Sequence, residues 1–290
     1  MSHLEDGNNE VASLGMYEAG GEEGSGFHVF NVAPDQYHRS EVLQRSGAID
    51  ISCKLDKVIH GAMSADSDYY ATLLVMRWSF QAKNKRRISE ANIELLFEPG
   101  PGGEDVEVER ISFEGDSYSL MPTTQQESIT KGSEASVGVD QFASVGLTGK
   151  WEKTTSSEKT YAATLYGVKQ VVNNLPPYRI AKWTLSENEA QLTGIPATLK
   201  VAVLVSRQDR EKFSCKIGFS CKTDWKSSTQ SFFKKIPKDD PIIFQPNPRD
   251  KGTRPNKNVS YDNDELQSED LGKYCEVSYR TVIKDAQKTR

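Results

Sequence analysis

The feature that most constrains the fold is an alternation of apolar and polar side chains along the middle of the chain. Apolar residues occupy every second position in residues 49–55 and 213–221, and residues 106–113 show the same alternation with one interruption at Arg110. Side chains two residues apart lie on the same face of a β-strand, whereas a helix repeats every 3.6 residues. The alternation therefore predicts strands with one buried face and one solvated face.

Two further segments, 69–80 and 198–206, are more continuously apolar and β-branched. That composition is typical of central strands covered on both faces. Breakers such as Pro99–Gly103 separate the predicted strands, and helix candidates are few. We therefore expect an all-β fold, an antiparallel β-sandwich that is C2-like or immunoglobulin-like.

The composition divides the chain into three parts. Residues 1–25 are rich in Gly, Glu and Asn, and no Lys or Arg precedes Arg39, so we expect a disordered acidic arm. Residues 26–246 form the predicted β-sandwich domain. Residues 247–290 are expected to be a polar linker and C-terminal tail, within which 274–283 has the pattern of a last strand or short helix.

Charge and targeting signals exclude several classes of protein. The 36 Lys+Arg against 41 Asp+Glu give a net charge of −5, so we do not expect a nucleic-acid partner. No apolar run has the length of a membrane-spanning helix, and the N-terminus lacks the pattern of a signal peptide. These features predict a cytoplasmic protein, in which the four cysteines are free thiols.

The segment from 132 to 172 has a distinct pattern of residue types. Apolar residues alternate with Ser, Gly and charged residues, a polar stretch at 154–158 looks like a turn, and a second apolar stretch begins at 161. This pattern predicts a long amphipathic hairpin, such as the ones that line membrane pores or extend the edge of a sandwich. We favour the edge hairpin and keep membrane insertion open. The candidate residues for contact with a membrane or partner are Val137, Val139, Val145, Leu147 and Trp151.

Motifs that carry catalysis are missing from the sequence. It contains no G-x-S-x-G nucleophile elbow, P-loop or dinucleotide fingerprint, and its four histidines have no metal-binding spacing. Cys215 and Cys221 are expected in the core, and the Asp clusters are expected in solvated turns. We therefore assign no catalytic residue, cofactor or metal ligand, and we expect a protein that is not an enzyme.

The one concentrated basic run lies between two predicted strands. It comprises Lys83, Lys85, Arg86 and Arg87 and is a candidate phosphate-contacting patch. A short basic loop on an acidic protein is more often a solvated turn, which is the interpretation that we favour.

The stretch W-T-L-S-E-N at 183–188, followed by G-I-P at 194–196 and D-D-P-I at 239–242, resembles β-rich intracellular proteins of filamentous fungi. The resemblance covers about residues 49–246. That group has no established activity, so the resemblance implies a β-rich fold and carries over no site residue.

Three functions remain open on the sequence alone. The first is a cytosolic, non-enzymatic β-sandwich protein that mediates protein–protein interaction, with a partner of unknown identity. The second is a membrane-active or pore-forming β protein that uses the 137–168 hairpin, although the acidic balance argues against attraction to anionic lipid. The third is a small-molecule-binding protein or an atypical enzyme of a biosynthetic pathway. An exposed edge strand also leaves homo-oligomerisation open.

Overall fold

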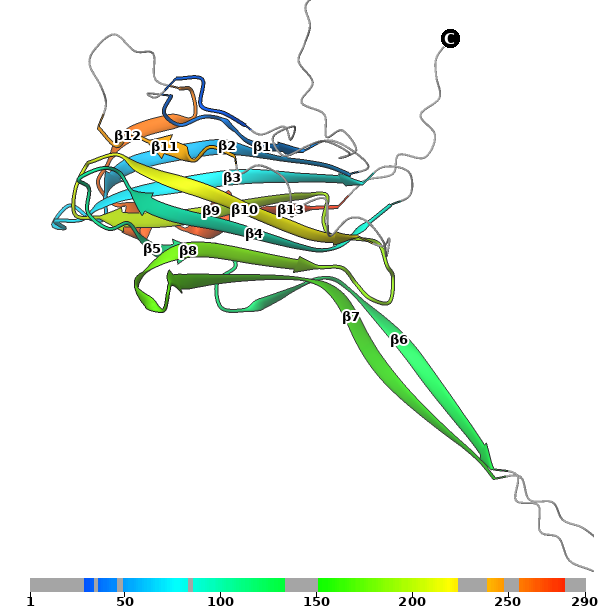
Figure 1. The fold of residues 1–290 in the computed structure, drawn as a ribbon. Coiled ribbons are helices and arrows are strands. Elements are labelled where there is room, and N and C mark those ends of the chain that lie inside the picture. Colours follow the sequence, from blue (N-terminus) through cyan, green and yellow to red (C-terminus); the bar gives the residue numbers. More distant parts are fainter. Residues whose placement is uncertain are drawn as a thin grey trace, which may run out of the picture.

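Two β-sheets pack face to face, and a long two-stranded ribbon leaves one end of the pair (Figure 1). The computed structural model describes residues 29–33, 36–45, 49–82, 86–133, 151–223, 239–247 and 256–279. The expected acidic arm, residues 1–25, lies outside the described residues. The all-β sandwich expected from the alternation is confirmed.

Thirteen strands and two short 3-10 helices make up the described chain. They are β1 (Glu41–Arg45), β2 (Ile49–Ala62), β3 (Tyr70–Ala82), β4 (Ile88–Pro99), β5 (Glu107–Ile111), β6 (Ser117–Ser133), β7 (Trp151–Val172), β8 (Leu175–Ser186), β9 (Thr198–Arg207), β10 (Phe213–Thr223), β11 (Ile242–Phe244), β12 (Val259–Asn263), η1 (Leu266–Ser268), η2 (Leu271–Tyr274) and β13 (Glu276–Ser278).

One sheet has seven strands, in the order β1-β2-β3-β9-β13, with β12 paired to β2 and β5 paired to β9. Its pairs are antiparallel except for β12, which runs parallel to β2. The strands β3 and β9 are buried along nearly their whole length, as expected for central strands covered on both faces. The segment after residue 247 thus contributes both β12 and β13 to this sheet.

The other sheet has six strands in the order β11-β10-β4-β8-β7-β6. In β4 the buried side chains of Ala91, Ile93, Leu95 and Phe97 alternate with less buried ones, so this sheet has one dry face and one wet face. The strand β6 lies at the end of the order, and β7 and β8 separate it from β4.

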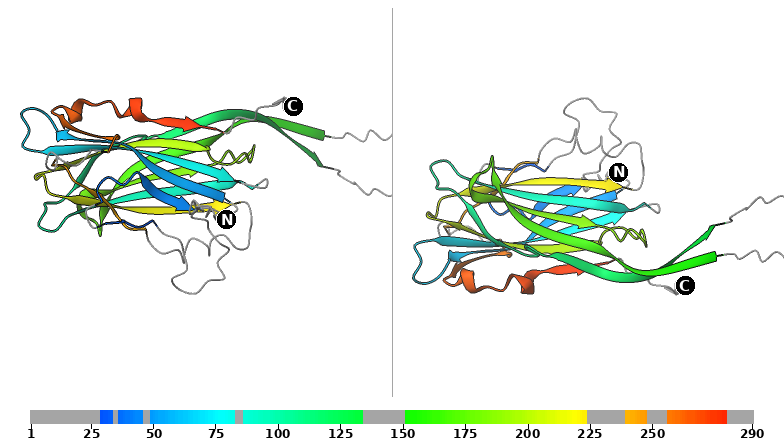
Figure 2. Two further views of the ribbon diagram at one scale, coloured as in Figure 1. Left: turned by 90° about the horizontal axis from the view of Figure 1, so that it is seen from above. Right: turned by 90° about the horizontal axis from the view of Figure 1, so that it is seen from below.

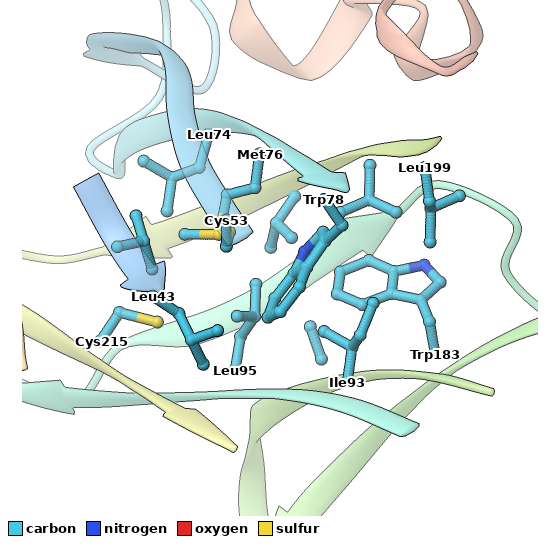
Figure 3. Packing of buried hydrophobic residues seen from close by; sticks show 14 of the residues in the cluster. Leu43, Cys53, Leu74, Met76, Trp78, Ile93, Leu95, Trp183, Leu199 and Cys215 are labelled. Carbon is cyan, nitrogen blue, oxygen red and sulfur yellow. The ribbon is translucent and has the colours of Figure 1, made fainter. Parts of the chain in front are cut away.

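The main core lies between the sheets (Figure 3). Trp78 of β3 and Trp183 of β8 are fully buried, and they approach each other from opposite sheets. The Trp183 indole N–H donates a hydrogen bond of 2.8 Å to the carbonyl of Ser112. Burying each large apolar side chain contributes about 1.5–3 kcal/mol to folding, so this layer dominates the stability of the sandwich.

A smaller apolar cluster covers the outer face of the seven-stranded sheet. It joins Leu73 and Val75 of β3 to Leu266 of η1 and Leu271 of η2. The two 3-10 helices therefore cover this face of the sheet. Because β3 is covered on both faces, it carries apolar side chains at consecutive positions. Figure 2 shows the C-terminal segment lying along this side of the sandwich.

One local expectation is wrong. The polar stretch 154–158, expected to form a turn, lies inside β7, where its residues pair with 126–130 of β6. Thr has a high preference for strands, so a polar run that contains two Thr residues is compatible with a strand. Over this stretch β7 therefore pairs with β6, and the two strands are joined through residues 134–150.

Candidate functional site: the projecting ribbon and its root

The ribbon formed by β6 and β7 extends well beyond the sandwich (Figures 1 and 2). The two strands pair from Ser117↔Tyr166 to Ser133↔Trp151. The other neighbour of β7 is β8, and that pairing starts only at Thr164. Among the described strands, residues 151–163 of β7 therefore have β6 as their sole neighbour.

The root of the ribbon is the part of β7 around Gly167, where β7 lies within the sandwich. There the backbone of β7 closely approaches residues 113–115, which connect β5 to β6. Gly167 of β7 donates its N–H to the carbonyl of Phe113 at 2.9 Å, and Gly115 donates to the carbonyl of Gly167 at 3.1 Å. A Cβ on residue 167 would lie 2.7 Å from the Phe113 oxygen, so only glycine fits there without displacement. Lys169 adds an ion pair of 3.1 Å with Glu114.

The pairing shifts where the ribbon leaves the sandwich. Leu120 pairs with Ala163 and Thr123 pairs with Tyr161, so β6 carries one extra residue there. Within this bulge Met121 adopts a φ of 49° and is 63% exposed. Such bulges bend a strand and increase its twist, which sets the direction of the ribbon. Asn188 donates to the carbonyl of Tyr161 at 3.2 Å and ties the β8–β9 segment to this point.

The basic patch predicted from the sequence is only partly described. Lys83 and Lys85 lie outside the described residues. The Nε of Arg87 lies 3.0 Å from a carboxylate oxygen of Glu187, which also accepts the N–H of Gly194 at 3.0 Å. Arg86 and Arg87 both line a crevice beside the ribbon root. The structure thus brings the two arginines to the root of the ribbon, a placement that their sequence positions do not reveal.

The predicted hairpin residues lie mostly beyond the described chain. Val137, Val139, Val145 and Leu147 are outside it, and Trp151 is the first residue of β7, with its backbone paired to Ser133. Sequence reasoning missed the root residues Gly167 and Met121, because a single glycine or an exposed methionine carries no pattern of its own.

A series of buried, hydrogen-bonded polar side chains lies beside the seven-stranded sheet. His38 Nε2 lies 2.9 Å from His60 Nε2, and His60 Nδ1 lies 2.8 Å from the Thr72 hydroxyl. Arg207 donates to the same hydroxyl at 3.1 Å, and the backbone N–H of Gln245 donates to His38 Nε2 at 3.2 Å. Burial lowers the pKa of His38 to about 4, and burial, with the neighbouring His38 and Arg207, lowers the pKa of His60 to about 2.

The cysteines do not form a reactive site. Cys53, Cys215 and Cys221 are buried free thiols, as expected for Cys215 and Cys221. Burial raises the pKa of Cys53 and Cys215 well above the ordinary thiol value, and that of Cys221 to about 12. These thiols are therefore protonated near neutral pH, which makes them poor nucleophiles. Within the described ranges, no group of three or more His, Cys, Asp or Glu side chains could hold a metal ion.

Asp239 and Asp240 bind the backbone of the first described segment, residues 29–31. Asp239 forms a buried ion pair of 2.7 Å with Arg45 and also accepts the backbone N–H of Val29, while Asp240 accepts the N–H of Asn31. These contacts hold the first described segment against the edge of the sandwich, next to β11.

Comparisons with known proteins identify no family. No protein-family model matches the chain, and no curated protein matches it. Among solved structures, the crystal structure of the Clostridium perfringens NetB toxin in the membrane inserted form aligns with 60% of this chain and 78% of that chain. The identity is 7% and the TM-score is 0.26. No helix in the described part of the chain is long and apolar enough to cross a membrane.

Proposed function

We propose that this chain is a membrane-active protein whose projecting ribbon inserts into a lipid bilayer, with several copies joining their ribbons side by side to form a pore. The observation that carries the proposal is the ribbon itself, which runs away from the sandwich and has no described strand paired to either lateral edge there. An isolated two-stranded ribbon is marginally stable in water. Its length therefore calls for a partner surface that the described chain does not supply.

The open edges indicate what that partner is. Beyond the sandwich, neither the outer edge of β6 nor residues 151–163 of β7 pairs with another described strand. Unpaired N–H and C=O groups cannot be left exposed inside a bilayer, so inserted strands must join neighbours until no edge remains. Each ribbon offers two edges, which is the requirement for such closure between identical copies.

The sequence beyond the ribbon supports insertion. In the described register, residue i pairs with residue 284 − i, for example Ser133 with Trp151 and Lys131 with Lys153. Odd-numbered residues therefore pair with odd-numbered residues. As part of the proposal, we extend this register to the residues between the two strands. The odd positions there carry no charge and include Ala135, Val137, Val139, Ala143, Val145, Leu147 and Trp151, whereas the charged residues Glu134, Asp140, Lys150 and Glu152 fall on even positions.

The length of this charge-free face fits a bilayer. Lys131 and Lys153 flank it, and the 21 residues between them are enough for two strands of about nine residues joined by a turn of about three. A strand needs about 9–11 residues to cross the hydrocarbon core. Trp151 stands next to the flanking charges, where aromatic residues favour the interface between membrane and water.

Leakage of a trapped dye tests the proposal directly. The full chain is added to vesicles of phosphatidylcholine, with and without phosphatidylserine, and dye release is measured. The wild-type chain is expected to release dye. Val145→Asp and Leu147→Asp are expected to reduce release at least about tenfold, because a carboxylate on the lipid face must leave water.

The matched controls place the same charge on the even positions. Ser144→Asp and Thr148→Asp are expected to retain release, because these positions are assigned to the water-filled face. Equal loss in both pairs of variants would contradict the alternation, and absence of release from every vesicle would overturn the proposed function. Circular dichroism of each variant checks that the sandwich is folded.

The open edge of β6 also favours a second candidate, the cytosolic protein-interaction function. A strand from another protein could add to residues 117–133 through backbone hydrogen bonds, a common mode of recognition. This candidate predicts no dye release. It predicts instead that a proline in the exposed edge, for example Gln125→Pro, abolishes association with a partner chain without changing vesicle integrity.

A further inference from the structure

The contact between His38 and His60 joins elements of the two sheets. His38 is bound to β11, because its backbone N–H donates to the carbonyl of Ile243 at 2.8 Å. His60 belongs to β2. The strand β11 is an edge strand of the six-stranded sheet, whereas β2 belongs to the seven-stranded sheet. The 2.9 Å between the two imidazoles therefore connects the sheets on the β11 side of the sandwich.

The segment around β12 covers this contact, at the end of the sandwich away from the ribbon (Figures 1 and 2). Tyr261 of β12 stacks on the His60 ring, with 5.3 Å between the ring centroids, and its hydroxyl donates to the carbonyl of Gln245 at 3.4 Å. Asn256, just before β12, donates to the carbonyl of His38 at 3.2 Å. The pairing of β12 with β2 is short and parallel. The attachment of β12 therefore depends strongly on the residues around the histidine pair.

The surroundings of the pair oppose a positive charge on either imidazole. Arg207 is buried and donates to the hydroxyl of Thr72, which also contacts His60. A hollow of about 50 Å³ borders His60 on another side. The charged or titratable groups that contact the pair or line this hollow are Tyr37, Tyr70, Arg207, Arg210, Tyr261 and Asp264. Two of them are guanidinium groups and one is a carboxylate, so a proton on either histidine adds to a cluster that is already positive.

Protonation also removes the hydrogen bonds of His38. Its Nε2 accepts the backbone N–H of Gln245 at 3.2 Å and faces Nε2 of His60 at 2.9 Å. A proton on that nitrogen would face the Gln245 donor, which would lose its acceptor. A proton on His60 would lie next to the guanidinium of Arg207. Both imidazoles must therefore leave their present positions in order to become charged.

We infer that the His38–His60 contact is an acid-sensitive closure: in mild acid both imidazoles become charged and separate, and β12 and residues 37–38 detach from β2 while the core between the sheets stays folded. The core around Trp78 and Trp183 contains no titrating histidine, so the same change of pH does not act on it directly. The inference does not depend on membrane insertion, and it stands if the proposed function fails.

Proton linkage gives the size of the effect. A histidine in the opened form has an ordinary pKa near 6.5, whereas in the closed form burial lowers the pKa of His38 to about 4. Between pH 7.5 and pH 5, His38 alone thus shifts the equilibrium toward the opened form by about thirtyfold. The pKa of His60 is about 2, so His60 contributes a similar factor if it is also exposed. Carboxylates remain mostly ionised at pH 5, so the histidines dominate the response.

Hydrogen exchange of the full chain, followed by mass spectrometry at pH 7.5 and pH 5, tests the inference. Each exchange rate is divided by that of an unstructured peptide at the same pH, because the chemical rate itself depends on pH. Peptides that cover β12 and residues 242–247 are expected to lose protection by at least about thirtyfold, whereas peptides of β8 are expected to keep it. No loss at β12, or an equal loss in β8, would overturn the inference, since an equal loss indicates global unfolding.

His38→Gln separates the charge from the packing. The glutamine side chain carries an amide oxygen that can accept the Gln245 N–H, but it takes up no proton. The loss of protection at β12 between pH 7.5 and pH 5 is therefore expected to be about thirtyfold smaller than in the wild type. Asn256→Ala is the control, because it weakens the attachment of β12 without removing a titrating group. It is expected to lower protection at both pH values and to keep the wild-type ratio between them. A wild-type ratio in His38→Gln would overturn the inference.

Discussion

His60 Nε2 lies 2.9 Å from His38 Nε2, and the surrounding donors fix the position of every proton between them. The N–H of Gln245 can only donate, so His38 Nε2 is an acceptor and His60 Nε2 must carry the proton. Arg207 can only donate to the Thr72 hydroxyl, which in turn donates to His60 Nδ1. Both imidazoles are therefore neutral in the folded chain.

This geometry predicts loss of stability in mild acid. The groups that contact the pair include Thr72, Arg207, Tyr37, Tyr261, Phe244 and Gln245, and none of these is a carboxylate. An unfolded histidine has a pKa near 6.5, whereas the pKa of folded His38 is about 4 and that of His60 is lower still. Between these values the unfolded state binds more protons, so the free energy of unfolding falls as the pH drops below 6.5.

For His38 alone the loss reaches about 3 kcal/mol by pH 4, at 1.36 kcal/mol for each pKa unit. Urea unfolding between pH 7 and pH 4 measures the change. His38→Gln removes one titrating group, so its curve is expected to be flatter over this interval than that of the wild type. Parallel curves for the two proteins would contradict the assignment.

Thr72 links the histidine pair to Arg207, and its hydroxyl is therefore predicted to matter more than its methyl group. Thr72→Val keeps the shape of the side chain but leaves His60 Nδ1 and one Arg207 donor without their partner. We expect it to lower the free energy of unfolding by about 1–3 kcal/mol, as for other buried groups left unpaired. Thr72→Ser retains the hydroxyl and serves as the control. A loss in Thr72→Ser as large as in Thr72→Val would show that packing, and not the hydrogen bonds, is responsible.

The sequence predicts the sandwich well because the burial of each strand face determines the pattern of apolar residues along that strand. Residues 49–55 alternate because one face of β2 is buried, and 69–80 do not alternate because η1 and η2 cover the second face of β3. Such patterns depend on neighbours along one strand. They are therefore visible without knowing which strands lie together.

The histidine pair and the crevice could not be predicted, because each depends on contacts between distant segments. His38 and His60 belong to different segments, and the acceptor role of His38 is set by Gln245, 207 positions further along the chain. Arg86 and Tyr279 meet at the crevice only because β13 pairs with β9.

The turn expected at 154–158 was wrong for a different reason. A polar run such as this one is compatible with a turn and also with a strand, so the residue types alone do not distinguish the two.

Gly167 is predicted to control how firmly the ribbon is attached to the body. In Gly167→Ala the new Cβ would lie 2.7 Å from the Phe113 carbonyl, so the contact between β7 and the β5–β6 connection must open. We expect a loss of about 1–3 kcal/mol in the free energy of unfolding, typical of strain at a close backbone approach. Gly103→Ala is the matched control, because its Cβ would find ordinary space, with its nearest neighbour at 3.4 Å. Equal stability of the two variants would refute this role of Gly167.

The alternation assigned to the segment beyond the ribbon gives the last prediction. Single cysteines are introduced at positions 143 to 148 in a Cys275→Ser background and labelled with a fluorophore that brightens in apolar surroundings. The background removes the one thiol that is not buried, since Cys53, Cys215 and Cys221 are. With vesicles present, the labels at 143, 145 and 147 are expected to brighten and those at 144, 146 and 148 to remain dim, because adjacent residues of a strand face opposite sides. A signal repeating every three to four residues would indicate a helix in the membrane, and a uniform signal would indicate that the segment does not insert as a strand.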